Sequence, residues 1–328
     1  MAYNTIIDDY DDELKRTKRN QIIIGFVSVV FAFLCFISFV WHKSIWDFKD
    51  ITAVSAGDSH TVGLKSDGTV VTAGVGFGDN IDVKVWTDII SVSAGPYHTV
   101  GLKSDGTVVV TDSYDECNVD SWSDIIAVSV GSGHIVGLKS DGTVVASGSN
   151  DNGECDVAEW SDIVAVSASD NHTIGLKSDG TVVAVGKNDN GQCNVDEWTD
   201  ITAISTNHSH TVGLKSDGTV IAVGTNEYGK CDVDNWTDVI AVSVGAFHTV
   251  GLKSDGTVLV VGSNSEGQCN IDNWTNIEAI SAGQWHTVAI KTNGTVVAIG
   301  DNYDGQCYVS VESLFASIIN KIKNIEVF

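Results

Sequence analysis

Seven histidines recur along this chain at an almost constant spacing, 38 residues in the step from His172 to His210. Imidazole side chains bind metal ions and transfer protons near neutral pH, so the register could carry chemistry. A catalytic residue is normally needed once, however, whereas a hydrogen bond that holds a scaffold is needed in every repeat. We therefore interpret these histidines as structural. They are His60, His98, His134, His172, His210, His248 and His286.

Six cysteines share a second register and could form disulfides or bind a metal. They are Cys117, Cys155, Cys193, Cys231, Cys269 and Cys307. A disulfide needs α-carbons within about 7 Å, and equivalent points on the outer parts of neighbouring repeats diverge. Neither a Cys-x-x-Cys pair nor a Cys–His pair at ligand spacing is present. We therefore expect buried free thiols, no metal and no cofactor.

Short apolar runs rich in Val, Ile and Thr must position these side chains. In one repeat they are residues 239–245, 248–253, 257–262 and 268–271, and turn residues separate them. Such runs are typical of β-strands, and Asp-Gly between two of them predicts a hairpin with a type I′ turn. The pair recurs as Asp67-Gly68, Asp105-Gly106, Asp141-Gly142, Asp179-Gly180, Asp217-Gly218 and Asp255-Gly256, with Asn293-Gly294 last.

Each repeat is therefore predicted to be a four-stranded antiparallel sheet. One such sheet is too small to bury its own faces, and seven packed radially bury one another. A linear stack would need polar caps at both ends, and the first and last repeats do not have the features of caps. The sequence predicts an all-β fold, a seven-bladed β-propeller over residues 46–310.

The repeated pattern "AG..HTVGLKSDGTVVA.G.N..GQC" resembles the repeat of the regulator of chromosome condensation family, over roughly residues 46–309. The resemblance implies a seven-bladed propeller. Short repeats with Cys after Gly-Gln are more similar to the bacterial branch, which includes a secreted propeller-type inhibitor of β-lactamases. WD-repeat propellers are the rival family, but these repeats lack the Trp-Asp dipeptide that closes that repeat.

Residues 22–41 are an uncharged, mostly apolar run, long enough for about 30 Å of helix, the thickness of a bilayer core. The basic residues ahead of it are Lys15, Arg16, Lys18 and Arg19. The positive-inside rule then predicts a single-pass protein with its N-terminus in the cytoplasm and the propeller outside. A cleaved signal peptide is the alternative, but no small-x-small cleavage site follows the run.

The predicted organisation has four parts: a cytoplasmic tail (1–20), a transmembrane anchor (21–42), the propeller (46–310) and a C-terminal segment (311–328). Within the last part, apolar residues at helical spacing indicate a helix packed on the closing blade. A closing strand is the alternative, because the Trp due near Glu312 is missing. We expect a monomer.

The charge of the chain excludes a class of partner. The net charge is −25, and no arginine follows Arg19. Phosphate-backbone binding needs clustered Lys and Arg, so nucleic acid is not an expected partner. The same observation, with the predicted anchor and orientation, opposes a nucleotide-exchange or chromatin role taken from eukaryotic members of the family.

A tryptophan register precedes each repeat from the second onward and is interpreted as aromatic wedges between blades, followed by an Asp or Asn that orders a turn. Its members are Trp86, Trp122, Trp160, Trp198, Trp236 and Trp274, and Trp46 starts the first copy. The loops at 149–154 and 187–192 contain Asn-Asp-Asn-Gly, which is weakly similar to calcium loops. No bidentate Glu follows at the required spacing, and an ordinary turn is favoured; calcium binding stays open.

Two loops of each repeat vary between copies and are expected on one face, opposite the Asp-Gly hairpins. The residue pairs before the histidines are Asp58-Ser59, Pro96-Tyr97, Ser132-Gly133, Asp170-Asn171, His208-Ser209, Ala246-Phe247 and Gln284-Trp285. The aromatic residues of this face are Phe77, Tyr97, Tyr114, Tyr228, Phe247, Trp285 and Tyr303. They belong to repeats five, six, seven, one and two, which are consecutive around a ring.

Exposed Tyr, Trp and Phe are enriched in binding hot spots, so these residues, with His208, predict a partner-binding face. The alternative is that some of the rings pack onto the blades. We expect a binding protein and not an enzyme, with a protein partner, or a cell-wall glycan, or an extracellular enzyme that it inhibits. An enzyme acting on envelope polymers would need a unique acidic or His constellation, for which His208 is the one candidate found.

Overall fold

The computed structural model describes residues 48–75, 83–111 and 117–309. The chain divides into two compact units, Met1–Ile45 and Trp46–Phe328, and all described residues belong to the second. The predicted anchor and tail therefore lie outside the described residues, as do Phe77, Tyr114 and residues 310–328. Among the residues that are described, no helix is long and apolar enough to cross a membrane.

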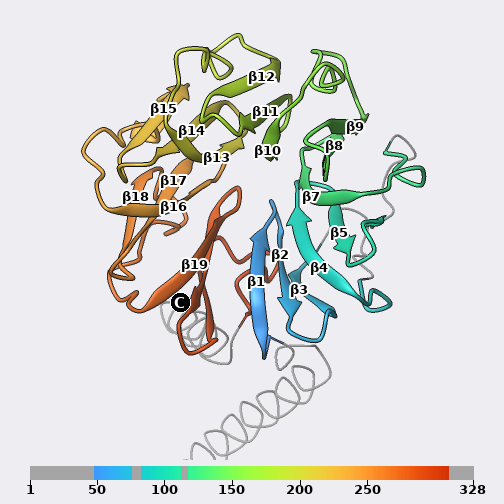
Figure 1. The fold of residues 1–328 in the computed structure, drawn as a ribbon. Coiled ribbons are helices and arrows are strands. Elements are labelled where there is room, and N and C mark those ends of the chain that lie inside the picture. Colours follow the sequence, from blue (N-terminus) through green and yellow to red (C-terminus); the bar gives the residue numbers. More distant parts are fainter. Residues whose placement is uncertain (1–47, 76–82, 112–116, 310–328) are drawn as a thin grey trace, which may run out of the picture. The chain divides into compact units, whose positions relative to one another are not determined.

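The described part contains seven three-stranded antiparallel sheets in which the strands pair in chain order (Figure 1). The first four sheets are β1 (Ile51–Ala56), β2 (His60–Lys65) and β3 (Val70–Gly74); β4 (Ile89–Ala94), β5 (Thr99–Lys103) and β6 (Val108–Val110); β7 (Ile125–Val130), β8 (His134–Lys139) and β9 (Val144–Gly148); β10 (Ile163–Ala168), β11 (His172–Lys177) and β12 (Val182–Gly186).

The remaining three sheets follow the same pattern. They are β13 (Ile201–Asn207), β14 (His210–Lys215) and β15 (Val220–Gly224); β16 (Val239–Val244), β17 (His248–Lys253) and β18 (Val258–Gly262); β19 (Ile277–Ala282), β20 (His286–Lys291) and β21 (Val296–Gly300). A 3₁₀ turn, η2 (Glu227–Gly229), follows β15.

The sheets contact one another in a closed cycle. The first strand of each sheet packs against the first strand of the next, and β19 of the last sheet packs against β1 of the first. Side-chain hydrogen bonds also join the ends: Thr61 Oγ1 lies 3.0 Å from His286 Nε2, and the Ala56 N–H donates to Ser281 Oγ. This is the arrangement of a seven-bladed β-propeller, and among the described residues it closes without a strand exchanged between the ends of the chain.

The expected fourth strand is wrong wherever the structure describes that segment of a blade. Its backbone N–H groups bond within a local turn and are not available to pair with the third strand. In the sixth repeat the Cys269 N–H donates to Asn264 Oδ1, the Asn270 N–H to the Gly267 carbonyl, and the Ile271 N–H to the Cys269 carbonyl. The Asn at the start of the loop therefore competes with the sheet for these donors.

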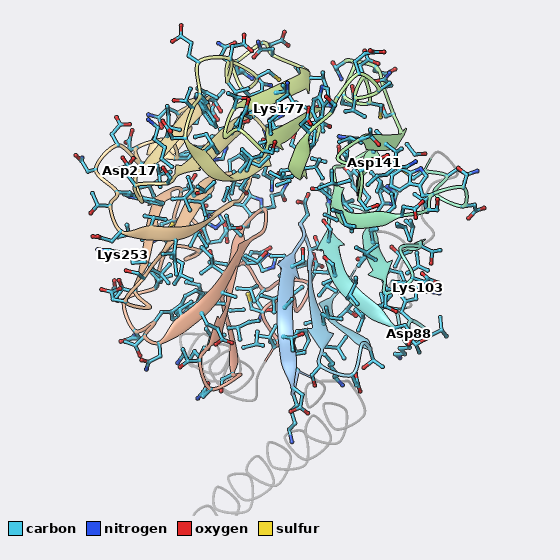
Figure 2. The ribbon with its side chains drawn as sticks, in the orientation of Figure 1. Asp88, Lys103, Asp141, Lys177, Asp217 and Lys253 are labelled. Atoms are coloured by element: carbon cyan, nitrogen blue, oxygen red, sulfur yellow. The ribbon has the colours of Figure 1, made fainter. Side chains whose placement is uncertain are left out.

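The expected type I′ hairpin is also wrong. Gly68 has a φ of 78°, but Asp67 does not have a positive φ. The Asp67 carboxylate accepts hydrogen bonds from the N–H and hydroxyl of Thr69, and the Gly68 N–H donates to the Lys65 carbonyl. This is a three-residue loop in which only the glycine is left-handed. Asp141 and Asp217, labelled in Figure 2, occupy the same position and are exposed.

Tryptophan side chains lie between neighbouring sheets. Trp86 packs with Leu64 of the first sheet and Ile89 of the second in one hydrophobic cluster. It also covers Gly101, where an added β-carbon would lie 2.9 Å from the ring. The glycine in the middle strand is thus what admits the indole.

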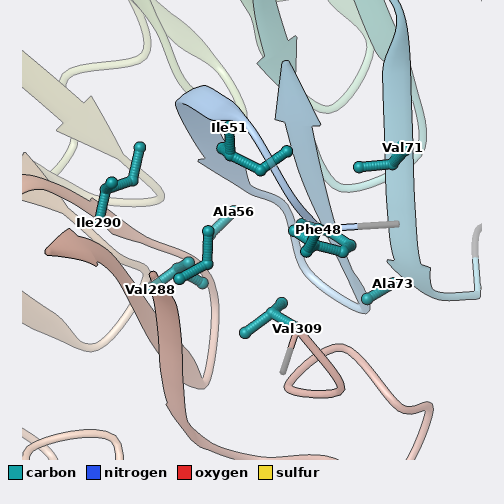
Figure 3. Packing of buried hydrophobic residues seen from close by; sticks show 9 residues of the cluster. Phe48, Ile51, Ala56, Val71, Ala73, Val288, Ile290 and Val309 are labelled. Carbon is teal, nitrogen blue, oxygen red and sulfur yellow. The ribbon is translucent and has the colours of Figure 1, made fainter. Parts of the chain in front are cut away.

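The first blade uses Phe48 in place of a tryptophan. Phe48 lies against Gly63 and belongs to the cluster that joins the first and last sheets, with Val288 and Val309 (Figure 3). Phe48 was not predicted from the sequence, in which the nearest tryptophan is Trp46, a residue outside the described part of the chain. Phe48 stands three positions before Ile51, as Trp86 stands three before Ile89.

Candidate functional site

The seven register histidines are buried, and six of them hydrogen-bond to a neighbouring sheet. In each case Nε2 lies 2.8–3.0 Å from a threonine hydroxyl. The pairs are His60–Thr99, His134–Thr173, His172–Thr211, His210–Thr249, His248–Thr287 and His286–Thr61. In the third repeat Ile135 replaces the threonine and offers His98 no hydroxyl. These contacts make the histidines part of the scaffold.

The hydrogen-bond pattern fixes the protonation of these imidazoles. The Thr249 hydroxyl donates its proton to the Lys230 carbonyl, so it can only accept from His210, whose Nε2 must carry the hydrogen. Burial lowers the pKa of His60 and His248 to about 4 and that of His286 to about 3. Such histidines are neutral at physiological pH and are poor candidates for acid–base chemistry.

Serines of the first strands surround the axis of the ring. In six sheets a serine Oγ accepts the backbone N–H of the following sheet at 2.9–3.1 Å. These are Ser55, Ser129, Ser167, Ser205, Ser243 and Ser281. All of them except Ser243 line a polar axial cavity of about 150 Å³, together with small residues of the first strands.

Two carboxylates of the variable loops line the same cavity, and the sequence analysis did not identify them. Asp58 belongs to the first repeat and Asp170 to the fourth. Burial, and then the nearby Asp170, raises the pKa of Asp58 to about 7. Burial also raises the pKa of Asp170, while His208 opposes that rise. Both aspartates occupy the same loop position, which was the one available signal in the sequence.

The structure places the described aromatic residues of the variable loops at one end of the blades. Tyr97, Phe247 and Trp285 precede register histidines, and Tyr228 and Tyr303 lie in loops after third strands. The exposed fraction is 37% for Tyr97, 66% for Tyr228 and 93% for Tyr303, while Phe247 and Trp285 are half-buried. Phe77 and Tyr114 are outside the described residues.

Four of the predicted residues form one contiguous group, the aromatic cluster, defined as His208, Tyr228, Phe247 and Trp285. The Phe247 and Trp285 rings stack with centroids 3.9 Å apart and an interplanar angle of 18°. His208 lies 5.8 Å from Phe247, and Tyr228 meets it edge-on at 6.4 Å. The cluster spans the fifth to seventh repeats. Tyr303 has no ring contact with it among the described residues.

A buried lysine lies beside the cluster. The Lys230 side chain is 1% exposed, and its ammonium is 5.9 Å from the Phe247 ring centroid. It donates to Ser209 Oγ at 3.2 Å and to the Ala246 carbonyl at 3.1 Å. Burial lowers the pKa of this ammonium. Sequence analysis did not select Lys230, although it alone is a lysine at this position of the loop.

The third and fourth repeats have polar loops at the same level. Ser132 donates its hydroxyl to the Asp170 carbonyl of the next repeat at 3.1 Å. In the Asn-Asp-Asn-Gly loop of the fourth repeat, Asn188 Oδ1 accepts the Cys193 N–H and Nδ2 donates to Asn194 Oδ1. Its amide is therefore used by the turn. Among the described residues, no three His, Cys, Asp or Glu side chains are grouped to hold a metal.

The six repeated cysteines are free thiols. Cys269 Sγ lies 3.1 Å from the Ser263 carbonyl, and Cys155 Sγ lies 3.2 Å from the Ser149 carbonyl. Burial raises the pKa of both thiols to about 11. Because the thiolate is the reactive form, these cysteines are not suited to nucleophilic chemistry.

Solved structures with the same fold come from yeast and plants. Prp20p from Saccharomyces cerevisiae has a TM-score of 0.61 and 14% identity, covering 83% of this chain and 86% of that chain. The CRINKLY WD40 ectodomain of the Arabidopsis thaliana receptor kinase ACR4 has a TM-score of 0.62 and 19% identity, covering 77% and 96%. The ectodomain of the Physcomitrella patens receptor kinase CR4 has a TM-score of 0.61 and 18% identity, covering 75% and 72%.

At these identities the structural likeness shows the fold alone. No curated protein sequence matched the chain. The family model of the regulator of chromosome condensation (RCC1) repeat matches seven segments, which are 51–80, 89–111, 125–154, 163–192, 201–230, 239–268 and 277–306. Each of these segments contains one of the three-stranded sheets described above. The chain therefore belongs to the family of proteins built from regulator of chromosome condensation repeats.

Proposed function

We propose that this protein is a binding scaffold that recognises a protein partner through the loop face carrying the aromatic cluster. The observation that carries the proposal is the contiguity of His208, Tyr228, Phe247 and Trp285 across three repeats. Partly exposed aromatic side chains that contact each other offer a large rigid area at small entropic cost. Prp20p, which has the same fold, is described as binding Gsp1p and histones.

The charge of the molecule narrows the class of partner. A net charge of −25 disfavours nucleic acid and anionic membrane surfaces, and it favours a partner whose contact surface is neutral or basic. An extracellular enzyme inhibited by the loop face is a narrower form of this proposal. A cell-wall glycan is the alternative ligand for the same face.

The propeller is proposed to stand outside the cytoplasmic membrane, anchored by residues 22–41. Support comes from the apolar run and the four basic residues before it. Two reporters fused in turn to the C-terminus test the orientation. One is active only in the cytoplasm, and the other is active only outside it. Activity of the cytoplasmic reporter would overturn the proposed location and would renew interest in the exchange-factor role of eukaryotic family members.

The experiment for the binding proposal is a cross-linked capture from envelope and secreted fractions, read by mass spectrometry. The baits are the full chain and the triple variant Tyr97→Ala, Phe247→Ala and Trp285→Ala. A matched control carries Ser59→Ala and Asn171→Ala, which change the same loop position where the residue is not aromatic. We expect specific proteins with the parent and control baits and their loss with the triple variant. Equal capture by all three folded baits would reject the aromatic face as the site.

A further inference from the structure

Lys230 does not make the hydrogen bond that the equivalent residue makes in the other described loops of this type. The side chain at this position is Glu154, Gln192, Gln268 or Gln306 in the other repeats, and its oxygen accepts the backbone N–H two residues earlier. The distances are 2.7 Å from Asn152, 3.0 Å from Asn190, 3.0 Å from Glu266 and 3.1 Å from Asp304. An ammonium group has no acceptor, so Lys230 cannot make this bond.

The backbone of the fifth repeat differs at the residue that loses the bond. Tyr228 has φ 61° and ψ 13°, in the left-handed region that residues with a β-carbon rarely adopt. The equivalent residues Asn152, Asn190, Glu266 and Asp304 do not have a positive φ. Among the loops that the structure describes, this turn therefore occurs only in the repeat that contains the lysine, and it presents the Tyr228 ring edge-on to Phe247.

Lys230 also acts on the neighbouring repeat. Its ammonium donates to the Ala246 carbonyl, directly before Phe247, and to Ser209 Oγ, directly after His208. One buried side chain thus contacts residues directly next to two cluster residues, His208 and Phe247, in two adjacent blades. Its ammonium also lies 5.9 Å from the Phe247 ring centroid, within the range of a cation–π interaction.

We propose that Lys230 is the positioning residue of the binding face, orienting Tyr228 and Phe247 into one cluster and so determining which partner the face selects. The partner-selection part rests on the proposed function, whereas the positioning part concerns the loop geometry alone. The glutamine or glutamate of the other repeats secures its own loop, and the lysine instead links its loop to the next blade.

Two substitutions in the full chain separate the two actions of the lysine. Lys230→Gln restores the amide of the other repeats. We expect a crystal structure of this variant to show a negative φ at Tyr228, with its N–H bonded to the introduced amide oxygen, and loss of the ring contact with Phe247. Lys230→Met offers neither an ammonium donor nor an amide oxygen. We expect Tyr228 to remain left-handed in that variant while Phe247 moves away from Trp285.

The control is Gln192→Glu in the fourth repeat, which keeps an acceptor as Glu154 does naturally, and which should change neither loop. A positive φ at Tyr228 in Lys230→Gln would overturn the inference, as would an unmoved Phe247 in Lys230→Met. Both results are readable without any partner, so the positioning claim stands or falls independently of the proposed function.

Binding gives the second readout. For a partner identified by the capture experiment, we expect Lys230→Gln to weaken affinity at least tenfold with an unchanged melting temperature, and Gln192→Glu to stay within twofold. Affinity within twofold of the parent for a Lys230→Gln variant whose loop has moved would reject the role in selection. If the parent captures nothing, the proposed function fails and the crystal structures alone decide the positioning.

Discussion

The interior of the propeller uses the same residues in almost every repeat, whereas the residues of its loop face change from repeat to repeat. In the interior, a histidine of one sheet meets a threonine of the next with nearly the same distance in six places. Two residues earlier in the chain, the loop pairs have almost nothing in common. The difference teaches that the repeated chemistry holds the ring, while specificity depends on positions where a repeat departs from its neighbours.

The largest expected effect is a loss of folding stability on acidification, which acts through the register histidines of the interior. The register histidines are neutral when folded and have lowered pKa values, so the unfolded chain, with a histidine pKa of 6.5, binds more protons. Their stabilising contribution is complete above pH 6.5 and is lost as the pH falls to about 4. Each histidine that gains a proton only on unfolding costs about 1.4 kcal/mol per pH unit, so the most deeply buried register histidines together should unfold the domain within this window.

The raised pKa of Asp58 acts in the opposite direction, because its proton is bound more tightly in the folded state. Asp58 and Asp170 are two groups against seven histidines, so the histidine effect should prevail. Urea unfolding at pH 7.5, 6.0 and 5.0 measures the slope. Equal unfolding free energies at pH 7.5 and 5.0 would contradict the assigned role of the register.

A smaller effect is expected from the contact between tryptophan and glycine. A β-carbon at Gly213 would lie 2.7 Å from the Trp198 ring, so Gly213→Ala should destabilise the fold by about 1–3 kcal/mol. The seventh repeat already carries Ala289 at this position, and its Trp274 is only half-buried. Ala289→Gly should therefore change stability by about 1 kcal/mol or less. Thermal unfolding of both variants tests this difference. Equal losses of stability in the two variants would contradict it.

The smallest effect on stability is expected on the loop face. Phe247→Ala and Trp285→Ala remove half-buried rings that stack on each other, so each should cost about 1 kcal/mol or less in unfolding free energy. The double variant should cost less than the sum of the two, because either substitution already removes the stacked pair. A loss of several kcal/mol in calorimetry would instead make these rings part of the core.

Much of the fold could be predicted because it depends on periodic positions. Alternating apolar runs and Asp-Gly turns indicate seven β-sheets, and the variable pairs before each histidine identify the loop face. The fourth strand could not be predicted, since the Asn264 side chain takes the backbone donor that a strand would use. The segment contains apolar residues whether it forms a strand or a turn, so its sequence does not distinguish the two.

The aromatic residues of the candidate site were predicted from the sequence, but their arrangement was not. Phe247 and Trp285 stood out by residue type, yet their stacking depends on how adjacent blades are spaced. Asp58 and Asp170 come together only because the ring brings the first and fourth repeats to a common axis. Lys230 could have been found by comparing the repeats with one another, since it replaces an acceptor with a donor.

The bond between His286 and Thr61 has a consequence for the order of the chain. Its length matches that of the bonds between repeats that are consecutive in sequence, so the ring closes through the same hydrogen bond that joins its other blades. Phe48 and Val309 already lie in one cluster at the two ends of the propeller. A circular permutant of the ring, opened in an exposed Asp-Gly hairpin and joined near residues 48 and 309, should therefore rebuild all seven interfaces.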